Sequence, residues 1–369
     1  MGTEAPTSEE GSSHPLSFTP RLLEKVWGGR RLAALGKRLE RAGVGYGESW
    51  EIADLGVTSA SGAGGGAMQS VVATGPLAGR GIGEAMSAVG GPRPFPLLIK
   101  YLDAAENLSV QVHPSVEAAR RDSRAHLKTE SWYVVEAEAG ASLPFLYIGL
   151  KPGVTRQKFE AAARSGSVAG DGARHPVVGL MERIEARAGM CYTLPSGIVH
   201  ALGAGVVVAE VQTPSDTTYR LFDWGRAGRE LHMEAGLGSA FGVDGKPTVE
   251  RAASAGPIAE GELCLRLAET PFYTIDEVRL LDGDEATVGF PCRFGGKRSG
   301  SVPVERGFVL MVMGGKGELA EAEGGFASVS LGKGATVYVP PGCAKGAVLR
   351  GGEGLRVLRV GVLGGAEEK

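Results

Sequence analysis

The chain has 369 residues, and its 39 Lys and Arg against 42 Asp and Glu give a formal net charge of −3. A charge this near zero argues against a protein that binds nucleic acid by neutralising phosphates. No apolar run reaches the roughly 18 residues that a transmembrane helix needs, so we expect no membrane span. The length suits two domains better than one.

The ends and the composition favour a β-rich cytoplasmic protein. Residues 1–15 are polar and lack the apolar centre of a secretory signal, so we expect a disordered tail. The four cysteines form no Cys-x-x-Cys pair, which favours a reducing, cytoplasmic location over a disulfide scaffold. The 59 glycines and 20 prolines punctuate the chain often, which is typical of many short strands joined by turns.

The first half of the chain mixes predicted strands with two predicted helices. We expect residues 16–56 to be ordered and the glycine-rich stretch 59–67 to be an exposed loop. The apolar run at 95–102, bounded by prolines, predicts a buried strand. Helices are predicted over 115–127, where a serine can cap the start, and over 155–165.

The rest of the chain has a β pattern. A strand is predicted over 130–136, between the two helices. After Gly189 nearly every ordered segment resembles a strand, and short strands recur from about residue 262 to the end. The predicted fold class is therefore mainly β, with a few helices in the first half.

One internal repeat links the two halves. Residues 189–200 (GMCYTLPSGIVH) match residues 334–345 (GATVYVPPGCAK): each has a glycine, a short strand, Pro-x-Gly, and a polar side chain three residues later. Such a strand and turn are typical of a barrel edge, so two copies predict two related β-barrels. The first copy ends in His200 and the second in Lys345. Since lysine rarely binds metal, we expect the second barrel to be metal-free.

Four residues of the first half are candidate metal ligands. Gln111 and His113 are two positions apart in an alternating segment, so both side chains leave the same face of a strand. Glu130 opens the next strand, and His200 follows the Pro-Ser-Gly turn. Two imidazoles, a carboxylate and an amide oxygen suit a borderline divalent ion such as zinc. The remaining histidines are interpreted as surface or hydrogen-bonded residues: His14, His126, His175 and His232.

Charged residues near these candidates have two interpretations each. Glu210 interrupts an apolar strand, where a carboxylate is costly unless it is paired or functional. With Asp216 and Arg220 it forms either a structural ion pair or an acid–base carboxylate beside a cation that holds an anionic substrate. Lys128 either binds phosphate or a developing oxyanion, or is a solvated lysine at a helix end.

Seven motifs, in order, resemble the type I mannose-6-phosphate isomerases of the short bacterial class. They cover about residues 16–240 and are LEKVWGG, GESWEIAD, FPLLIKYLDA, NLSVQVHP, KTESWY, PSGIVHALG and SDTTYRLFDW. Residues 262–362 resemble the family's C-terminal cupin module more weakly. The resemblance implies two cupin (jelly-roll β-barrel) modules: a tail at 1–15, a catalytic cupin with inserted helices at 16–240, a linker at 241–261 and a metal-free cupin at 262–369.

The resemblance also implies a reaction and a metal. The reaction interconverts D-mannose 6-phosphate and D-fructose 6-phosphate through a cis-enediol, with one zinc ion per chain. The implied zinc ligands are Gln111, His113, Glu130 and His200.

The remaining site residues follow from the same resemblance and from their positions. Arg220 is implied to be catalytic, and the carboxylate that moves the proton is predicted to be Glu210 or, second, Asp216. Lys128 and Arg220 are predicted to bind phosphate and to stabilise the oxyanion, and the sequence leaves open which residue performs which task. Three further residues are predicted to line the pocket: Ser109, Lys100 and Trp27, the last either as a wall or as a core tryptophan.

Two other functions would use the same residue types. An iron-dependent cupin dioxygenase needs similar ligands, and a non-catalytic sugar-binding cupin would keep the pocket but lack part of the ligand or acid–base set. The charges of Lys128, Glu210 and Arg220 favour the isomerase, whose partner is a small sugar phosphate rather than nucleic acid or membrane. The substrate range, the native metal, the oligomeric state (a monomer is compatible) and the role of the C-terminal module stay open.

Overall fold

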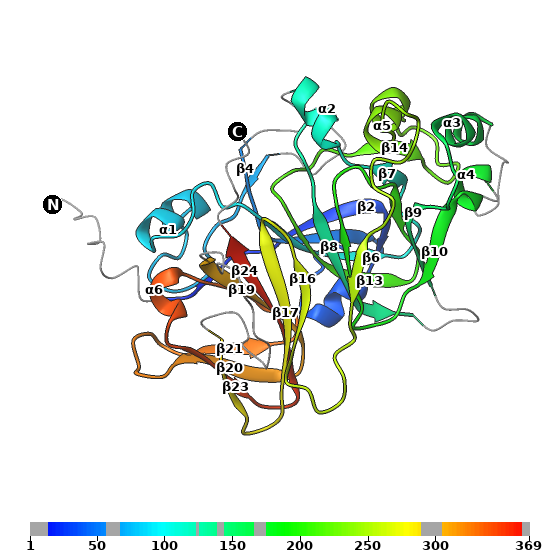
Figure 1. The fold of residues 1–369 in the computed structure, drawn as a ribbon. Helices are drawn as coiled ribbons and strands as arrows, with labels where there is room; N and C mark the ends of the chain where they lie inside the picture. Colours follow the sequence, from blue (N-terminus) through cyan, green and yellow to red (C-terminus); the bar gives the residue numbers. More distant parts are fainter. Residues whose placement is uncertain are drawn as a thin grey trace, which may run out of the picture.

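The computed structural model describes residues 14–56, 67–122, 125–138, 144–165, 175–288 and 305–363. Strands dominate these residues and the helices are short, so the predicted mainly-β fold class is confirmed (Figure 1). Most of the predicted tail, up to residue 13, and most of the predicted loop, from 59 to 66, lie outside the described residues.

Two antiparallel sheets, which we call the first sheet pair, contain most strands before residue 256. The seven-stranded sheet is built from β2 (Arg21–Gly29), β3 (Tyr46–Ile52), β6 (Leu98–Ala104), β8 (Glu130–Ala137), β11 (Cys191–Leu194), β13 (Val206–Gln212) and β15 (Ala253–Ala255), in the order β15-β11-β8-β13-β6-β2-β3. The five-stranded sheet is built from β7 (Val110–Val112), β9 (Phe145–Leu150), β10 (Met181–Glu185), β12 (His200–Leu202) and β14 (Tyr219–Phe222), in the order β10-β9-β12-β7-β14.

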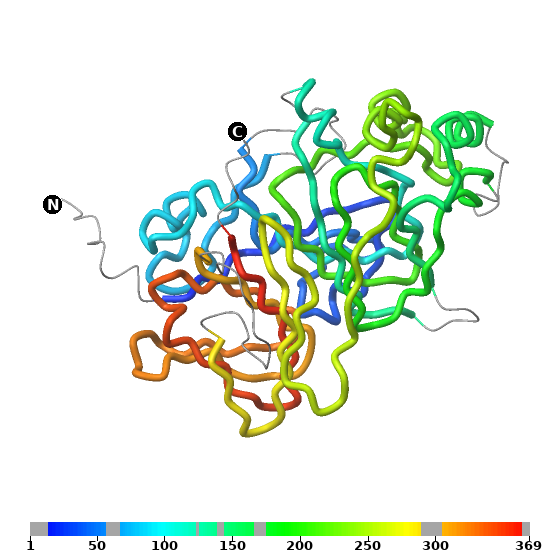
Figure 2. Tube along the Cα trace, viewed as in Figure 1, coloured from blue at the N-terminus to red at the C-terminus, as the bar shows by residue number. Residues whose placement is uncertain are grey.

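The second sheet pair contains the strands of the carboxy-terminal third. Its six-stranded sheet has the order β1-β22-β19-β24-β17-β16 and contains β1 (Leu16–Ser17), β16 (Cys264–Glu269), β17 (Tyr273–Leu280), β19 (Glu305–Gly314), β22 (Thr336–Val339) and β24 (Leu355–Leu363). Its four-stranded sheet has the order β18-β23-β20-β21 and contains β18 (Glu285–Thr287), β20 (Lys316–Glu321), β21 (Val329–Gly332) and β23 (Ala347–Gly351). Because β1 pairs with β22, the first described strand lies beside the last third of the chain (Figure 2).

The helices lie outside the sheets or at their ends. They are η1 (Arg31–Leu35), a 3₁₀ helix, and α1 (Ile82–Ala88), α2 (Val116–Arg121), α3 (Arg156–Arg164), α4 (Pro176–Gly179), α5 (Met233–Ala240) and α6 (Pro341–Ala344). A two-stranded ribbon, β4 (Asp54–Leu55) and β5 (Met68–Gln69), completes the described elements. Helices α3, α4 and α5 pack on the outer face of the five-stranded sheet through one buried cluster (Figure 1).

Both predicted helices form, and each begins where its capping residue predicts. The Ser115 hydroxyl accepts the backbone N–H of Ala118, and the Thr155 hydroxyl accepts that of Lys158. The prediction that the first helix continues to residue 127 is wrong, since α2 ends at Arg121. The backbone after it is bonded elsewhere: the carbonyl of Leu127 accepts the Thr213 hydroxyl, and other loop side chains bond residues 126 and 128.

The internal repeat holds for its first half only. Gly189 and Gly334 both have a left-handed backbone, with φ of 87° and 84°, and each precedes a strand. The first copy then turns into β12 at His200, but the second copy enters helix α6. Pro341 stands at the start of this helix, where the fixed φ of proline favours a helical turn. The predicted equivalence of the two Pro-x-Gly turns is therefore wrong.

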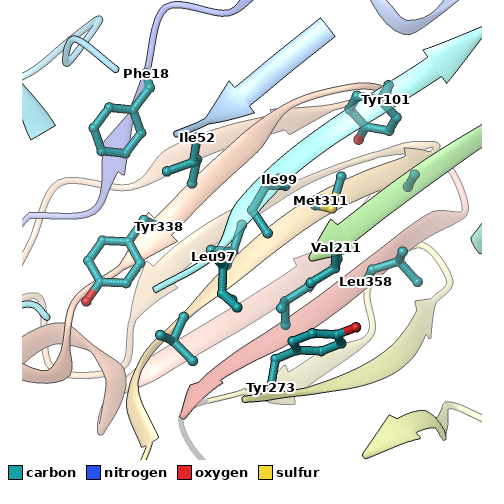
Figure 3. Close-up of a cluster of buried hydrophobic side chains, with 14 of the residues drawn as sticks. Phe18, Ile52, Leu97, Ile99, Tyr101, Val211, Tyr273, Met311, Tyr338 and Leu358 are labelled. Carbon is teal, nitrogen blue, oxygen red and sulfur yellow. The ribbon is translucent and has the colours of Figure 1, made fainter. Parts of the chain in front are cut away.

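The largest buried cluster lies between the two sheet pairs. It joins side chains of the seven-stranded sheet, such as Ile99 and Val211, to side chains of the six-stranded sheet, such as Met311 and Leu358 (Figure 3). The other face of the seven-stranded sheet is also buried, against the five-stranded sheet. Because both faces of this sheet are covered, all seven residues of β13 are buried. This explains why most of the strand is apolar without alternation.

Candidate metal centre and active site

Three buried side chains converge between the sheets of the first pair. His113 follows β7, Glu130 is the first residue of β8, and His200 is the first residue of β12; their candidate ligand atoms all lie within 4.8 Å of one another. The Nε2 atoms of His113 and His200 are 3.3 Å and 3.4 Å from the two carboxylate oxygens of Glu130. Tetrahedral zinc with ligands at about 2.0–2.1 Å separates its ligand atoms by about 3.3 Å, so the spacing fits this ion.

Both histidines turn their Nε2 atom to this point, where Nζ of Lys128 lies 3.3 Å from Nε2 of His113. Nδ1 of His113 donates to the carbonyl of Thr217, and Nδ1 of His200 donates to the carbonyl of Ile198, each at 2.9 Å. Burial, and next the ammonium of Lys128, lower the pKa of His113 to about 4, and burial lowers the pKa of His200. Both rings are therefore neutral near pH 7, which is the form that binds metal.

Glu130 completes a set of acceptors that faces a common centre. Burial raises the pKa of Glu130, but the ammonium of Lys128 outweighs it and holds that pKa well below its usual range. Neither carboxylate oxygen makes a well-aligned hydrogen bond within the described part of the chain. The ammonium of Lys128 lies 2.6 Å from Glu130 and 3.3 Å from Nε2 of His113. Two neutral imidazoles and one carboxylate are also ligand types that bind a divalent cation such as zinc, so this donor set fits one.

Gln111 lies beside this set. It faces His200 on β12 and Arg220 on β14 directly across the strands, so the three side chains share one face of the five-stranded sheet. Its Nε2 is 3.3 Å from Nε2 of His200, and its Oε1 accepts the Ser109 hydroxyl at 3.1 Å. A 180° rotation of the amide exchanges its oxygen and nitrogen, and a hydroxyl can pair with either. Gln111 is therefore positioned to serve as an oxygen ligand.

Charges of alternating sign extend from the centre across the seven-stranded sheet, and we call them the charge chain. The charge chain consists, in order, of Lys25, Glu48, Lys100, Glu210, Lys128 and Glu130. The nearest nitrogen and oxygen atoms of successive members are 3.0, 3.6, 3.0, 3.7 and 2.6 Å apart. All but the first are buried. The chain follows from sheet register, because Glu210 lies directly opposite Lys100 on β6.

Hydrogen bonds from indoles fix the carboxylates of the charge chain. Trp132 donates to Glu210 at 3.0 Å, and Trp50 donates to Glu48 at 2.6 Å. Burial lowers the pKa of Lys100, but the carboxylates of Glu210 and Glu48 outweigh it and hold that pKa above its usual range. Lys100 is therefore a protonated cation held between two carboxylates.

Arg220 is a buried cation of a different kind. Its Nη1 donates to the carbonyl of Glu230 at 2.5 Å, while its buried Nε has no hydrogen-bond partner in the described structure. Asp223 instead pairs with Arg226 at 2.7 Å and with Arg229 at 2.9 Å. Burial, and next the charge of Arg229, lower the pKa of Arg220. Among the described residues Arg220 has no carboxylate partner, so it is suited to bind an anion.

Comparisons with known proteins relate this chain to one family. The family model of the phosphomannose isomerase type I catalytic domain matches residues 16–145. Mannose-6-phosphate isomerase ManA of Bacillus subtilis is 33% identical over 239 residues, with coverage of 61% of this chain and 68% of that protein. The mannose-6-phosphate isomerase of Streptococcus mutans is 31% identical over 277 residues, with coverage of 71% and 78%.

The chain belongs to the type I phosphomannose isomerases.

Solved phosphomannose isomerases share its fold. The mannose 6-phosphate isomerase of Bacillus subtilis aligns over 94% of this chain and 98% of its own, with a TM-score of 0.70 and 23% identity. The Salmonella typhimurium enzyme bound to its substrate (F6P) and zinc aligns over 95% and 99%, with a TM-score of 0.63 and 14% identity. At these identities it is the fold that is common to the chains.

Most predicted site residues of this phosphomannose isomerase lie together. Three of the four candidate ligands converge on one point, and Gln111 lies beside His200 and bonds Ser109. Three further residues belong to the charge chain: Lys100, Lys128 and Glu210. The interpretation of Lys128 as a solvated lysine is wrong, because its side chain is buried against Glu130. The interpretation of Glu210 as an ion-pair partner of Arg220 is also wrong, since its partner is Lys100.

Two predicted site residues are not brought into these contacts. Trp27 packs in the buried cluster between the two sheets of the first pair, which matches the interpretation as a core tryptophan. Asp216 is half-exposed in the loop between β13 and β14, and it makes no hydrogen bond or ion pair with another described residue. Two of the histidines interpreted as surface or hydrogen-bonded residues are hydrogen-bonded: His175 caps α4, and His232 accepts the backbone N–H of Arg220.

Two buried residues near the centre were not predicted from the sequence. Glu48 belongs to the charge chain, and its spacing from Trp50 in GESWEI was the available signal. Gln212 lies opposite Glu130 across β13 and β8. Its Nε2 donates to the carbonyls of Thr213 and Ser215, while its buried Oε1 has no partner among the described residues.

None of the described helices is long and apolar enough to cross a membrane.

Proposed function

We propose that this chain is a zinc-dependent isomerase that interconverts D-mannose 6-phosphate and D-fructose 6-phosphate through a cis-enediol. The observation that carries the proposal is the convergence of His113, Glu130 and His200 on one buried point beside the charge chain. Membership of the type I phosphomannose isomerases supports the same substrate. The solved relative with bound substrate and zinc supports the choice of metal.

The metal would be held by Gln111, His113, Glu130 and His200. When bound, zinc supplies positive charge that stabilises negative charge on the sugar oxygens during proton transfer. The remaining chemistry belongs to the side chains around it.

We assign the proton transfer to Glu210. The reaction moves one proton between C2 and C1 and another between the oxygens on these two carbons. One carboxylate that reaches both carbons can serve as base and then as acid for the carbon-bound proton. Glu210 is buried, Trp132 fixes one of its oxygens, and the other oxygen makes no well-aligned hydrogen bond among the described residues. Asp216 is the second candidate, and its half-exposed position in a loop favours it less.

We assign phosphate binding to Arg220 rather than to Lys128. Lys128 lies between Glu130 and Glu210, at 2.6 Å and 3.7 Å, so two carboxylates already neutralise its charge. Arg220 has an unused Nε donor and no carboxylate partner within the described ranges. A guanidinium matches the geometry of a phosphate group, which can accept two parallel hydrogen bonds from it. Lys128 would instead orient the two carboxylates.

We also propose that catalysis belongs to the first sheet pair. Every candidate ligand and every member of the charge chain comes from its strands or from loops beside them. The domain boundaries at residues 240 and 262 stay a prediction, as does a metal-free second module. The cysteines of the described ranges, Cys191, Cys264 and Cys343, form no disulfide with one another. The cytoplasmic location stays a prediction.

The proposal is tested by measuring fructose 6-phosphate formed from mannose 6-phosphate in a coupled assay, together with metal content. We expect about one zinc ion per chain, loss of turnover on chelation and recovery on adding zinc. His200→Ala should lose both zinc and turnover. His126→Ala changes an exposed histidine of the same region and should keep both.

Three results would contradict the proposal. Normal turnover by His200→Ala without bound metal would exclude the zinc mechanism. Oxygen uptake with iron would support the dioxygenase instead. Sugar-phosphate binding without turnover in the zinc-loaded protein would support a non-catalytic cupin.

A further inference from the structure

We infer that Tyr273, in the six-stranded sheet, is a positioning residue for the candidate zinc ligand Glu130, an inference that rests on the proposed function. Tyr273 and Ser131 are both fully buried, and their hydroxyl oxygens are 3.0 Å apart. The Ser131 hydroxyl is also 2.9 Å from that of Thr193 on the neighbouring strand β11. Three hydroxyls thus join the second sheet pair to the strand that begins with Glu130.

The contact acts on Glu130 because successive side chains of a strand point to opposite faces. Glu130 points toward the metal centre, so Ser131 points to the other face of the seven-stranded sheet, where the six-stranded sheet packs. A hydrogen bond that fixes Ser131 also fixes the rotation of β8 about its own axis. That rotation sets the direction of the Glu130 carboxylate.

Glu130 needs such support because it stands at the end of its strand. Residues 125–129, which precede it, are not in a strand, and side chains of other loops hold them. The Thr213 hydroxyl accepts the N–H of Thr129 at 3.3 Å, and the Ser196 hydroxyl accepts the N–H of Lys128 at 2.8 Å. These bonds restrain the side of Glu130 toward the amino terminus, and Ser131 restrains the other side.

Tyr273 is itself firmly placed. It opens β17, and the Thr270 hydroxyl bonds both its N–H and its carbonyl at 2.9 Å. Its ring lies in the cluster between the sheet pairs, which also contains Val211 and Leu358 (Figure 3). A hydroxyl held this way transmits the position of the second sheet pair to the metal centre. The second pair then contributes to the site without supplying a ligand.

The decisive variant is Tyr273→Phe, which removes one oxygen and keeps the ring. Zinc affinity, measured by competition with a chelator, should fall roughly threefold to tenfold, below the 10–100-fold cost of removing a group that bonds a ligand directly. With cobalt in place of zinc, the visible absorption of the bound ion should change, because it reports the ligand geometry. Ser131→Ala should change both properties in the same direction. The double variant should be no weaker than Ser131→Ala, because the effect passes through Ser131.

The matched control is Tyr338→Phe. Tyr338 lies in the same buried cluster, and its hydroxyl donates to the carbonyl of Arg306 at 2.8 Å, away from β8. It should lose a similar amount of thermal stability and keep the zinc affinity and the cobalt spectrum of the wild type. The inference is overturned if Tyr273→Phe and Ser131→Ala match this control while the wild type binds zinc and turns over. A wild type without zinc binding or isomerase activity would instead overturn the proposed function itself.

Discussion

Single residues at the centre differ in whether the described structure leaves one of their polar atoms without a hydrogen bond. Glu210 is close to two lysines, yet one of its oxygens makes no well-aligned hydrogen bond with a described residue. Arg220 is buried with an unused donor. Lys100 and Lys128, in contrast, each lie between two carboxylates. The free oxygen supports the proposed role of Glu210 in proton transfer, and the unused donor supports the proposed role of Arg220 in anion binding.

The assignment of the base predicts that Glu210→Gln loses turnover without losing metal. The amide keeps the shape of the side chain and can still accept the Trp132 hydrogen bond, but it cannot take up a proton. We expect kcat to fall about 10²–10⁴-fold with zinc content unchanged. The matched variant Asp216→Asn should stay near the wild type. A large loss from Asp216→Asn, with little from Glu210→Gln, would exchange the two roles.

The assignment of the anion site predicts that Arg220→Lys weakens substrate binding. Lysine keeps the charge but loses the planar fork that meets two phosphate oxygens. We expect KM for mannose 6-phosphate to rise about tenfold, which equals about 1.4 kcal/mol, with zinc content unchanged. Arg226→Lys, whose guanidinium bonds Asp223 and the carbonyl of Asn107, should change KM little. Equal effects of the two variants would contradict the assignment.

At the scale of elements, a turn of the second sheet pair meets η1 of the amino-terminal region. Gly334 has φ of 84°, and a Cβ added there would lie 1.9 Å from the carbonyl oxygen of Leu35 in η1. Glycine is required here for two reasons, the left-handed backbone and the close approach of another backbone. The contact is one of several that connect the two ends of the chain, since β1 also pairs with β22.

This contact predicts a large cost for Gly334→Ala. The left-handed conformation costs alanine about 1–2 kcal/mol, and a clash with backbone adds about 1–3 kcal/mol. Gly324→Ala is the matched variant, because Gly324 has φ of 80° but no atom within 4 Å of the added Cβ. It should lose only the conformational part. Urea denaturation measures both free energies of unfolding, and equal losses would show that the contact with η1 contributes nothing.

At the scale of the whole molecule, the two sheet pairs share their largest buried cluster. Unfolding either pair would expose one face of this cluster on the other, so we expect the described structure to unfold as one cooperative unit. The four tryptophans all lie between residues 27 and 224, whereas strands continue to residue 363. Tryptophan fluorescence therefore reports on the first sheet pair, and far-ultraviolet circular dichroism reports on both.

The shared cluster predicts that these two signals change together. In a urea titration the fluorescence and circular dichroism midpoints should coincide. Chelation of zinc should lower both midpoints by the same amount, because metal bound only to the folded state stabilises the whole unit. A fluorescence transition well separated from the circular dichroism transition would show that the sheet pairs unfold independently.

Much of this architecture could be predicted locally. The capping residues Ser115 and Thr155 mark the helix starts, and alternation places Gln111 and His113 on one face. These features depend on a few neighbouring residues and on fixed periodicities, so a sequence pattern reports them. Residue spacing alone suggested candidate metal ligands. The resemblance of seven motifs, in order, to one family was needed to select the four ligands among them.

Tertiary structure alone decided which distant side chains meet. Ser131 and Tyr273 are 142 positions apart and touch through the packing of two sheets. The sequence is compatible with either a solvated or a buried Lys128. The pairing of β8 with β13 decides this, because it brings Glu130 and Glu210 to the lysine side chain. Sequence periodicity specifies which face a side chain leaves from. The register and stacking of strands specify what it meets there, and these depend on contacts that no local pattern records.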